Sequence, residues 1–466
     1  MAAVCPSESV GLLPRAQLLC ELHGTLGRRS KGGEHRRTLG LAPDGSCVAW
    51  ATGRTTVRIV PWKQLCGAQG PVSSLTSSLF PERLIDCGEP VLSLALGSRG
   101  TPSGRKARTR QNTGICCGNG DGWVAAKSLG GQGCWATREK WDIGLSLEAG
   151  ESRKNGEVWT SGSLPGFGES GNRWRRFRFG GDNLLLATGL VSGRLQIWDV
   201  GTGQFLLYLM DHSAAILHLT FSPDGLLTLV SASQDRTLRV WDMRDDGNMV
   251  KVLKGHPGWV RCSAFSPDSS LLCSVGNGKS ACLWTVKSWH LRAKLDAHHH
   301  DVVSCDFSPD GAVLATASFD STVCLWEPQS ATLLNTLRHL LPPPSPIFAG
   351  GANDHWVKAV AFSPDGMHLA TLADDRLMRL WRLGEECPIA VASVSGGLCC
   401  SYTSGGWVLI VGTSDGGLQF WLPPPHVPTL QQLCRLSLRL HLSIADLHSV
   451  KLPASLSRFL NYLDIS

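Results

Sequence analysis

The chain has 466 residues, of which 42% are hydrophobic and 18% charged, so it can bury a large core and does not have the composition of a disordered protein. Its formal net charge is +6, but residues 97–176 contain 13 basic and 7 acidic residues and account for the whole surplus, so we expect no nucleic-acid partner. Because the sequence shows neither a signal peptide near Met1 nor a run of about 18 apolar residues, we expect no membrane span. We expect an intracellular protein, cytoplasmic or nuclear, whose cysteines are free thiols that mostly fill core space.

Residues 1–40 are predicted to be a disordered tail. A glycine-rich segment, residues 98–173, shows neither strand alternation nor a helical face; 17 of residues 97–176 are glycine. It falls between two apolar runs, 91–96 and 184–188, where the rest of the chain has a short hairpin. We predict a disordered insertion that replaces the first hairpin of the second repeat, with an ordinary regulatory loop as the alternative.

One pattern recurs along the chain: a His, then Phe-Ser-Pro-Asp-Gly, an apolar run, an Asp, and a closing Trp. Pro-Asp-Gly between apolar runs favours a hairpin, because Pro fixes φ and Gly accepts a positive φ. A unit of about 40 residues with a turn signal every ~10 residues is typical of a four-stranded propeller blade. We therefore predict an all-β, seven-bladed β-propeller over residues 41–425, whose blades close at Trp62, Trp198, Trp241, Trp284, Trp326, Trp381 and Trp421.

The repeat resembles the WD40 family. That resemblance implies a buried, hydrogen-bonded set of four side chains within a blade, which here would be His212, Ser233, Asp235 and Trp241, and in a later blade His298, Ser318, Asp320 and Trp326. Gly278 and Ser192 stand where Asp is expected, so their blades should be tied less tightly. Large apolar residues near blade loops are typical anchors for a partner, and we select Trp259, Phe319 and Trp356 as candidate substrate contacts.

Residues 426–466 change to a helical pattern after Pro423-Pro424-Pro425. Leu430, Leu433, Cys434 and Leu438 share one helical face, and a second stripe is formed by Leu456, Phe459, Leu460 and Leu463. About 40 residues cannot bury two such stripes alone, so they must pack on the propeller as a cap or bind a partner.

The first stripe looks like the BC box of a SOCS box, a small α-helical module. The resemblance implies that Leu430, Leu433, Cys434 and Leu438 dock on the elongin B–elongin C adaptor. In that family a Leu-Pro-x-Pro element directs the choice of cullin; Leu452-Pro453-Ala454-Ser455 lacks the second Pro, which weakens the case for cullin-5. Ser455 could instead cap the last helix.

Propeller and SOCS box together imply a non-enzymatic substrate-recognition subunit of an elongin B/C–cullin–RING ubiquitin ligase, which binds an unknown protein substrate. The alternative is a WD40 interaction scaffold without ligase function. Catalytic motifs carry little weight, because Gly412-Thr413-Ser414-Asp415-Gly416 matches a nucleophile elbow but is followed by no helix. His298-His299-His300-Asp301 is not expected to bind a metal, since His298 belongs to the repeat. We expect no cofactor.

Overall fold

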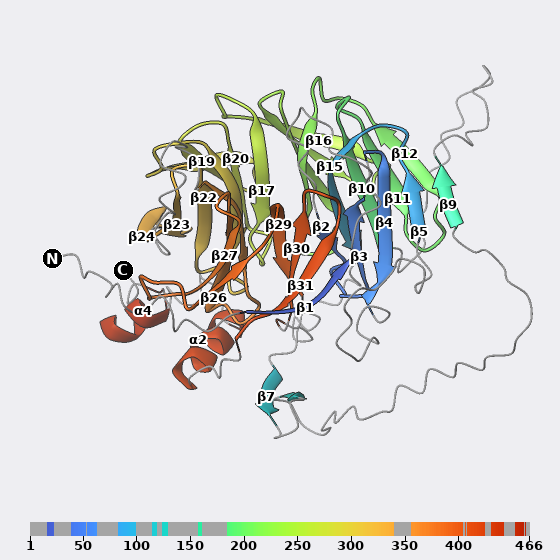
Figure 1. Cartoon of the computed structure of the whole chain (residues 1–466). Coiled ribbons are helices and arrows are strands. Elements are labelled where there is room, and N and C mark those ends of the chain that lie inside the picture. The colour runs from blue at the N-terminus through green and yellow to red at the C-terminus, as the bar shows by residue number, and fades with distance from the viewer. Residues whose placement is uncertain are drawn as a thin grey trace, which may run out of the picture.

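The chain folds into a ring of seven β-sheets, and two short helices follow the last strand of the ring (Figure 1). The computed structural model describes residues 16–22, 39–62 except 53, 83–98, 114–118, 124–128, 157–160, 184–339, 356–424 except 404, 405 and 407, 430–441, 453–460 and 462. The predicted all-β, seven-bladed propeller is confirmed.

The blades are numbered in chain order, and each runs outward from an inner strand. Blade 1 contains β2 (Leu39–Leu41), β3 (Cys47–Ala51), β4 (Thr56–Pro61) and β5 (Arg83–Asp86), and β9 (Glu157–Thr160) pairs in parallel with β5. Blade 2 contains β6 (Val91–Ser98), β10 (Leu184–Leu190), β11 (Leu195–Asp199) and β12 (Phe205–Leu209). Blade 3 contains β13 (Ile216–Phe221), β14 (Thr228–Ser233), β15 (Thr237–Asp242) and β16 (Asn248–Lys254).

The remaining four blades follow the same order. Blade 4 contains β17 (Val260–Phe265), β18 (Leu271–Gly276), β19 (Ser280–Thr285) and β20 (His290–Asp296). Blade 5 contains β21 (Val302–Phe307), β22 (Leu314–Ser318), β23 (Thr322–Glu327) and β24 (Thr332–Arg338). Blade 6 contains β25 (Val357–Phe362), β26 (His368–Ala373), β27 (Leu377–Arg382) and β28 (Ala390–Ser393). Blade 7 contains β29 (Gly397–Tyr402), β30 (Leu409–Thr413), β31 (Leu418–Leu422) and, as its outer strand, β1 (Gln17–Leu22).

The N-terminal strand β1 closes the ring by pairing antiparallel with β31, from Gln17 opposite Leu422 to Leu22 opposite Leu418. The prediction of a disordered tail over residues 1–40 is therefore wrong for residues 17–22, and it is also wrong for residues 39 and 40, which belong to β2. The physical reason is that β31 would otherwise present an unpaired strand edge, and a chain end that fills this edge satisfies its backbone groups. Residues 1–15 and 23–38 lie outside the described residues.

The glycine-rich segment enters between β6 and β10, which still pair along their whole length, from Ser98 opposite Leu184 to Val91 opposite Leu190. The insertion therefore replaces the first hairpin of blade 2, as its position in the repeat predicts, and blade 2 retains four strands. Within the segment, β7 (Gly114–Gly118) and β8 (Val124–Ser128) form a separate antiparallel pair. The disorder predicted for residues 98–173 is contradicted at residue 98 and at β7, β8 and β9, which are paired strands, and elsewhere it concerns positions outside the described residues.

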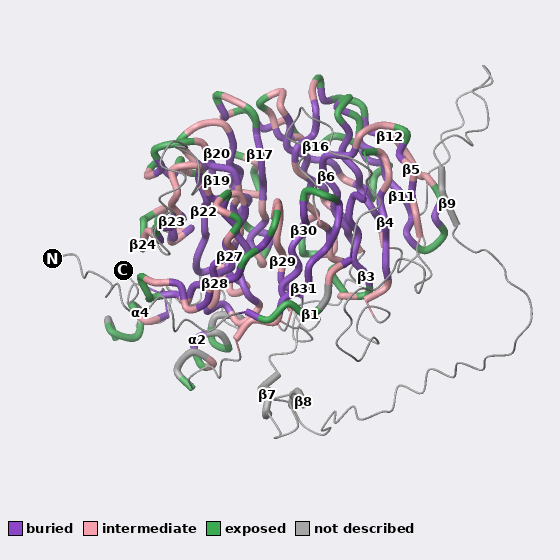
Figure 2. Tube along the Cα trace, viewed as in Figure 1, coloured by how far each residue is buried: buried purple, intermediate pink, exposed green. Residues whose placement is uncertain are grey.

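The core lies within and between neighbouring blades, so buried residues follow the strands while exposed residues gather at the turns (Figure 2). Trp198, Trp241 and Trp381 are among the largest fully buried side chains. Of the described cysteines, ten are free thiols and seven of these are buried, as expected for thiols that fill core space. Cys387 differs from this expectation because it is disulfide-bonded.

Two helices follow the propeller: α2 (Leu430–His441) and α4 (Ala454–Leu460). α2 contains the whole first predicted stripe, whereas α4 contains Leu456, Phe459 and Leu460 of the second, and Leu463 lies outside the described residues. α2 begins at Leu430, the first residue of the first predicted stripe. α4 begins at Ala454, so Ser455 lies inside its first turn instead of at the predicted cap.

Candidate functional site

Two regions can contact partners, and the first is an aromatic cluster formed by Trp259, His300, Phe319 and Trp356. The Phe319 and Trp356 rings stack with their centroids 4.5 Å apart and their planes at 19°. The His300 ring lies 6.0 Å from each of them. The guanidinium of Arg261 lies 5.5 Å from the Phe319 ring and 6.0 Å from the Trp259 ring, and so links Trp259 to the other rings.

Equivalent loops of blades 4, 5 and 6 build this cluster. Trp259 and Trp356 each directly precede an inner strand, and their carbonyls accept hydrogen bonds of 2.8 and 2.9 Å from the turns after β18 and β26. Phe319 lies in the matching turn of blade 5 and donates its N–H to Asp301 O at 3.0 Å. Because these bonds repeat in each blade, the three sequence-selected residues share one face of the propeller.

The cluster is partly open to solvent and its backbone is tightly held. Trp259 is 43% exposed, Phe319 and Trp356 are half-buried, and Arg261 is buried. Gly276, at the end of β18, lies so close that a Cβ there would be 2.0 Å from Trp259 O. Any side chain at Gly276 would therefore displace the Trp259 loop.

The buried set in blade 3 ties the inner loop to the blade. His212 Nδ1 lies 2.7 Å from Asp235 Oδ2, and its Nε2 lies 2.7 Å from the hydroxyl of Ser231. Trp241 donates its indole N–H to the same hydroxyl at 2.9 Å. The predicted Ser233 is therefore wrong: its hydroxyl donates to the carbonyls of Ala214 and Ala215, at 2.9 and 3.0 Å.

Blade 5 repeats this arrangement. His298 Nδ1 lies 2.9 Å from Asp320 Oδ2, and Nε2 lies 2.8 Å from Thr316 Oγ1, which accepts the Trp326 indole N–H at 2.9 Å. The predicted Ser318 is not the hydroxyl of the set; it donates to His300 O at 3.3 Å and accepts the Asp320 N–H at 3.1 Å. Residues two apart on a strand share one face, so Ser231 and Thr316 were as eligible by pattern as the serines two positions later.

The buried His residues of blades 4 and 5 differ in their surroundings and in their pKa. In blade 4, His256 bonds Ser274 at 2.7 Å, and Trp284 donates to the same hydroxyl, but Gly278 stands at the Asp position. Burial therefore lowers the pKa of His256 to about 4. Burial would also lower the pKa of His298, but its hydrogen bond to the Asp320 carboxylate and its interaction with Cys324 together outweigh burial and raise that pKa to about 9. The same pairing holds the pKa of Asp320 below its usual range, against the opposing effect of burial.

The second region is the exposed face of α2. Leu430 is 78% exposed, Leu438 is 40% exposed and Cys434 is exposed, whereas Leu433 is half-buried. Arg435, one residue after Cys434 and three before Leu438, is buried, and its guanidinium lies 3.8 Å from the Phe459 ring. The helix thus directs its apolar stripe to solvent.

The remaining predicted positions are only partly described. Pro453 is exposed, directly before α4, while Leu452 lies outside the described residues. Among the residues that the structure describes, no group of three or more His, Cys, Asp or Glu side chains is arranged to hold a metal ion. His298 is engaged by Asp320 and His300 by the aromatic cluster. None of the described helices is long and apolar enough to span a membrane.

Comparison with known proteins agrees with both parts of this architecture. Residues 203–242, 247–285, 289–327 and 347–382 match the family described as "WD domain, G-beta repeat". Over 450 residues the chain is 44% identical to WD repeat and SOCS box-containing protein 1 of Homo sapiens, an alignment that covers 93% of this chain and 92% of that protein. The chain belongs to the WD repeat and SOCS box-containing protein family. The protein of the same name from Danio rerio is 45% identical over 451 residues, with the same two coverages.

The family name contains two modules, WD repeats and a SOCS box, and both correspond to parts of the structure. The WD repeats of this WD repeat and SOCS box protein are the propeller blades, and its SOCS box corresponds to α2 and α4.

Proposed function

We propose that this protein is the substrate-recognition subunit of an elongin B/C–cullin–RING E3 ubiquitin ligase. The observation that carries the proposal is the exposed stripe of Leu430, Cys434 and Leu438 on a helix that also carries the buried Arg435. Leu430 is 78% exposed, so covering it with the groove of a partner would lower the free energy of the complex.

Adaptor binding would use the helix-in-groove mode, in which residues four apart along one helical face enter a hydrophobic groove. Leu430, Cys434 and Leu438 have this spacing, and Leu433 flanks them. We assign the elongin B–elongin C adaptor to this face.

A purely structural cap is the main alternative, and exposure separates the two. A cap would bury Leu430 and Cys434 against the propeller, yet both are exposed. The described part of α4 behaves differently, because Leu460 is buried and Phe459 half-buried. The module therefore uses one helix for attachment and leaves the other for a partner, which favours the ligase reading over a scaffold without a ligase.

The substrate side of the proposal is the aromatic cluster. Trp259, Phe319 and Trp356 supply rigid apolar area, and Arg261 lies between them; aromatic residues and Arg dominate binding energy at protein interfaces. The substrate would be a protein. This chain would carry no covalent step, because the cullin–RING module would bring the loaded conjugating enzyme and the rate enhancement would come from proximity.

The choice of cullin and the compartment complete the proposal. Pro453 is exposed and could contact a cullin together with Leu452, which makes cullin-5 our candidate despite Ser455 in place of the second Pro. We place the protein inside the cell, in the cytoplasm or the nucleus, since most of the described thiols are free.

Binding of purified elongin B–elongin C to the full chain tests the proposal, with calorimetry as the readout. We expect the wild type to bind and Leu430→Ala/Cys434→Ala to lose at least 100-fold in affinity, because two buried side chains typically cost about 3 kcal/mol together. Leu456→Ala is the matched control, since Leu456 is an exposed apolar residue of α4. Absence of binding by the wild-type chain would exclude the ligase function.

A further inference from the structure

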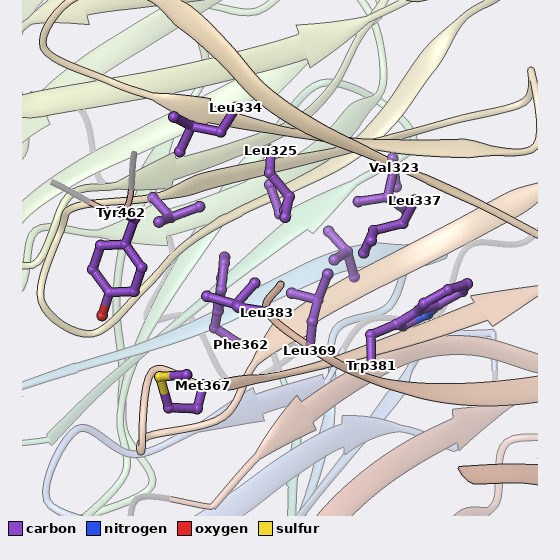
Figure 3. Close-up of a cluster of buried hydrophobic side chains, with 14 of the residues drawn as sticks. Val323, Leu325, Leu334, Leu337, Phe362, Met367, Leu369, Trp381, Leu383 and Tyr462 are labelled. Carbon is purple, nitrogen blue, oxygen red and sulfur yellow. The ribbon is translucent and has the colours of Figure 1, made fainter. Parts of the chain in front are cut away.

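Tyr462 attaches the end of the chain to the propeller. Its side chain is only 1% exposed and belongs to a hydrophobic cluster of blades 5 and 6. Figure 3 shows its ring beside Leu334 of β24 and close to Phe362 and Met367 of blade 6. The other members of this cluster come from the propeller, so the ring fills space in the propeller core.

The backbone conformation at Tyr462 is unusual for a tyrosine. Tyr462 has φ +58°, and its N–H donates to Phe459 O at 3.3 Å, so it ends α4 in the left-handed conformation. Glycine or asparagine usually occupies this position, because a Cβ is costly there. A bulky ring is kept in this conformation only when its surroundings compensate, and here the compensation is burial in the cluster.

Arg435 carries the attachment from α4 to α2. It is buried, and its guanidinium lies 3.8 Å from the Phe459 ring and 4.3 Å from the Tyr462 ring. These distances are within the range of cation–π attraction, which is stronger where water is excluded. A continuous path of contacts thus leads from the propeller through Tyr462 to Arg435, on the helix that presents Leu430 to solvent.

We propose that Tyr462 is a positioning residue that locks the helical module to blades 5 and 6 and so fixes the direction in which α2 presents its exposed face. The ring anchors α4, and Arg435 clamps α2 onto that anchor. The lock itself does not depend on what binds α2. Its consequence for ligase geometry, a constant distance between the adaptor and the substrate-binding face, rests on the proposed function.

Tyr462→Asn in the full chain tests the lock, because Asn tolerates the left-handed backbone but removes the ring. Hydrogen exchange followed by mass spectrometry should show amides of α2 and α4 exchanging about 100-fold faster, since loss of a buried aromatic side chain is typically worth this factor or more. Strands of blade 3 should keep their protection. Leu456→Ala, on the exposed side of α4, should change neither.

A second variant addresses the clamp separately. Arg435→Met keeps the aliphatic stem but removes the charge over both rings, and should speed exchange in α2 while α4 stays protected. Unchanged exchange of α2 and α4 in Tyr462→Asn would overturn the proposal, and so would a loss of protection that extends equally through blade 3. Elongin B–elongin C binding, measured on the same samples, separates the two hypotheses. If neither the wild type nor Tyr462→Asn binds the adaptor, the proposed function is refuted and the exchange result remains valid.

Discussion

Replacing Asp320 by Asn should destabilise the protein in a way that depends on pH. Against the opposing effect of burial, Asp320 and Cys324 together hold the pKa of His298 at about 9, whereas an unfolded His titrates near 6.5, and Asp320 is the strongest of the groups that raise it. A raised pKa in the folded state stabilises the fold fully below pH 6.5, and the contribution is lost as the pH rises through 9. In blade 4, where Gly278 replaces the Asp, His256 is instead kept neutral by burial.

The size of the effect follows from the shift. A difference of about 2.5 pH units corresponds to about 3 kcal/mol at pH 6, about 2.5 kcal/mol at pH 7 and under about 0.5 kcal/mol at pH 9.5. Asp320 also accepts bonds from Thr322 and from the His299 N–H, and their loss adds a constant cost of about 1–2 kcal/mol. The depressed pKa of Asp320 itself matters only in acid, because that contribution is lost as the pH falls toward the folded value.

Urea unfolding of wild type and Asp320→Asn at pH 6 and pH 9.5 measures the difference. We expect the mutational loss in the free energy of unfolding to be about 2–3 kcal/mol larger at pH 6. Asp245→Asn, in an exposed turn, serves as the control and should show no such pH dependence. An equal loss at both pH values would refute the assignment of the His298 charge to Asp320.

Three further predictions concern the buried set, the ring closure and the exposed thiol. Ser231→Ala leaves the indole and imidazole that it bonds unsatisfied and should cost about 1–3 kcal/mol in urea unfolding; a loss no larger than that of the exposed Ser330→Ala would contradict the network. Deletion of residues 1–22 removes β1 and should lower the thermal midpoint and promote aggregation in gel filtration; a monodisperse, equally stable product would show that β1 is dispensable. Cys434 should be alkylated in the native chain and protected by elongin B–elongin C, while the buried Cys273 reacts only after unfolding; peptide mass spectrometry distinguishes the two.

Much of the fold was predictable because the repeat is local. Each Pro-Asp-Gly hairpin and closing Trp lies within about 40 residues of its partners, and the blades follow in chain order. The outer strand of blade 7 was not predictable in this way, since Gln17 pairs with Leu422 and no local pattern reports a contact across the chain. Its segment, Gln17–Leu22, also lacks the repeat signature.

The sequence pattern could not identify which hydroxyl belongs to each buried set. Ser231 and Ser233 face the same side of β14, so strand periodicity cannot choose between them. The register chooses, because Ser231 lies opposite Arg239 and diagonal to Trp241, whereas Ser233 is beyond the paired part of β15. The Trp259, Phe319 and Trp356 positions could be selected as apolar residues near loops, but their stacking required the arrangement of three blades.

The anchor at Tyr462 was hidden for a different reason. Helical spacing selects Leu456, Phe459, Leu460 and Leu463, and Tyr462 does not belong to that stripe. Its burial follows from a left-handed residue at the helix end, which rotates the side chain away from the helical pattern and into the propeller. A tyrosine directly after a short terminal helix is a weak signal that sequence alone cannot interpret.

Reconstituted ubiquitination tests the central claim most directly. The full chain would be incubated with elongin B–elongin C, a cullin-5–RING module, activating and conjugating enzymes and ubiquitin, and modification of the chain itself would be followed by gel mobility. We predict ubiquitin transfer that needs the adaptor and is abolished by Leu430→Ala/Cys434→Ala but not by Leu456→Ala. Transfer that ignores the adaptor and survives the double substitution would contradict a role for the exposed α2 face in recruiting a ligase.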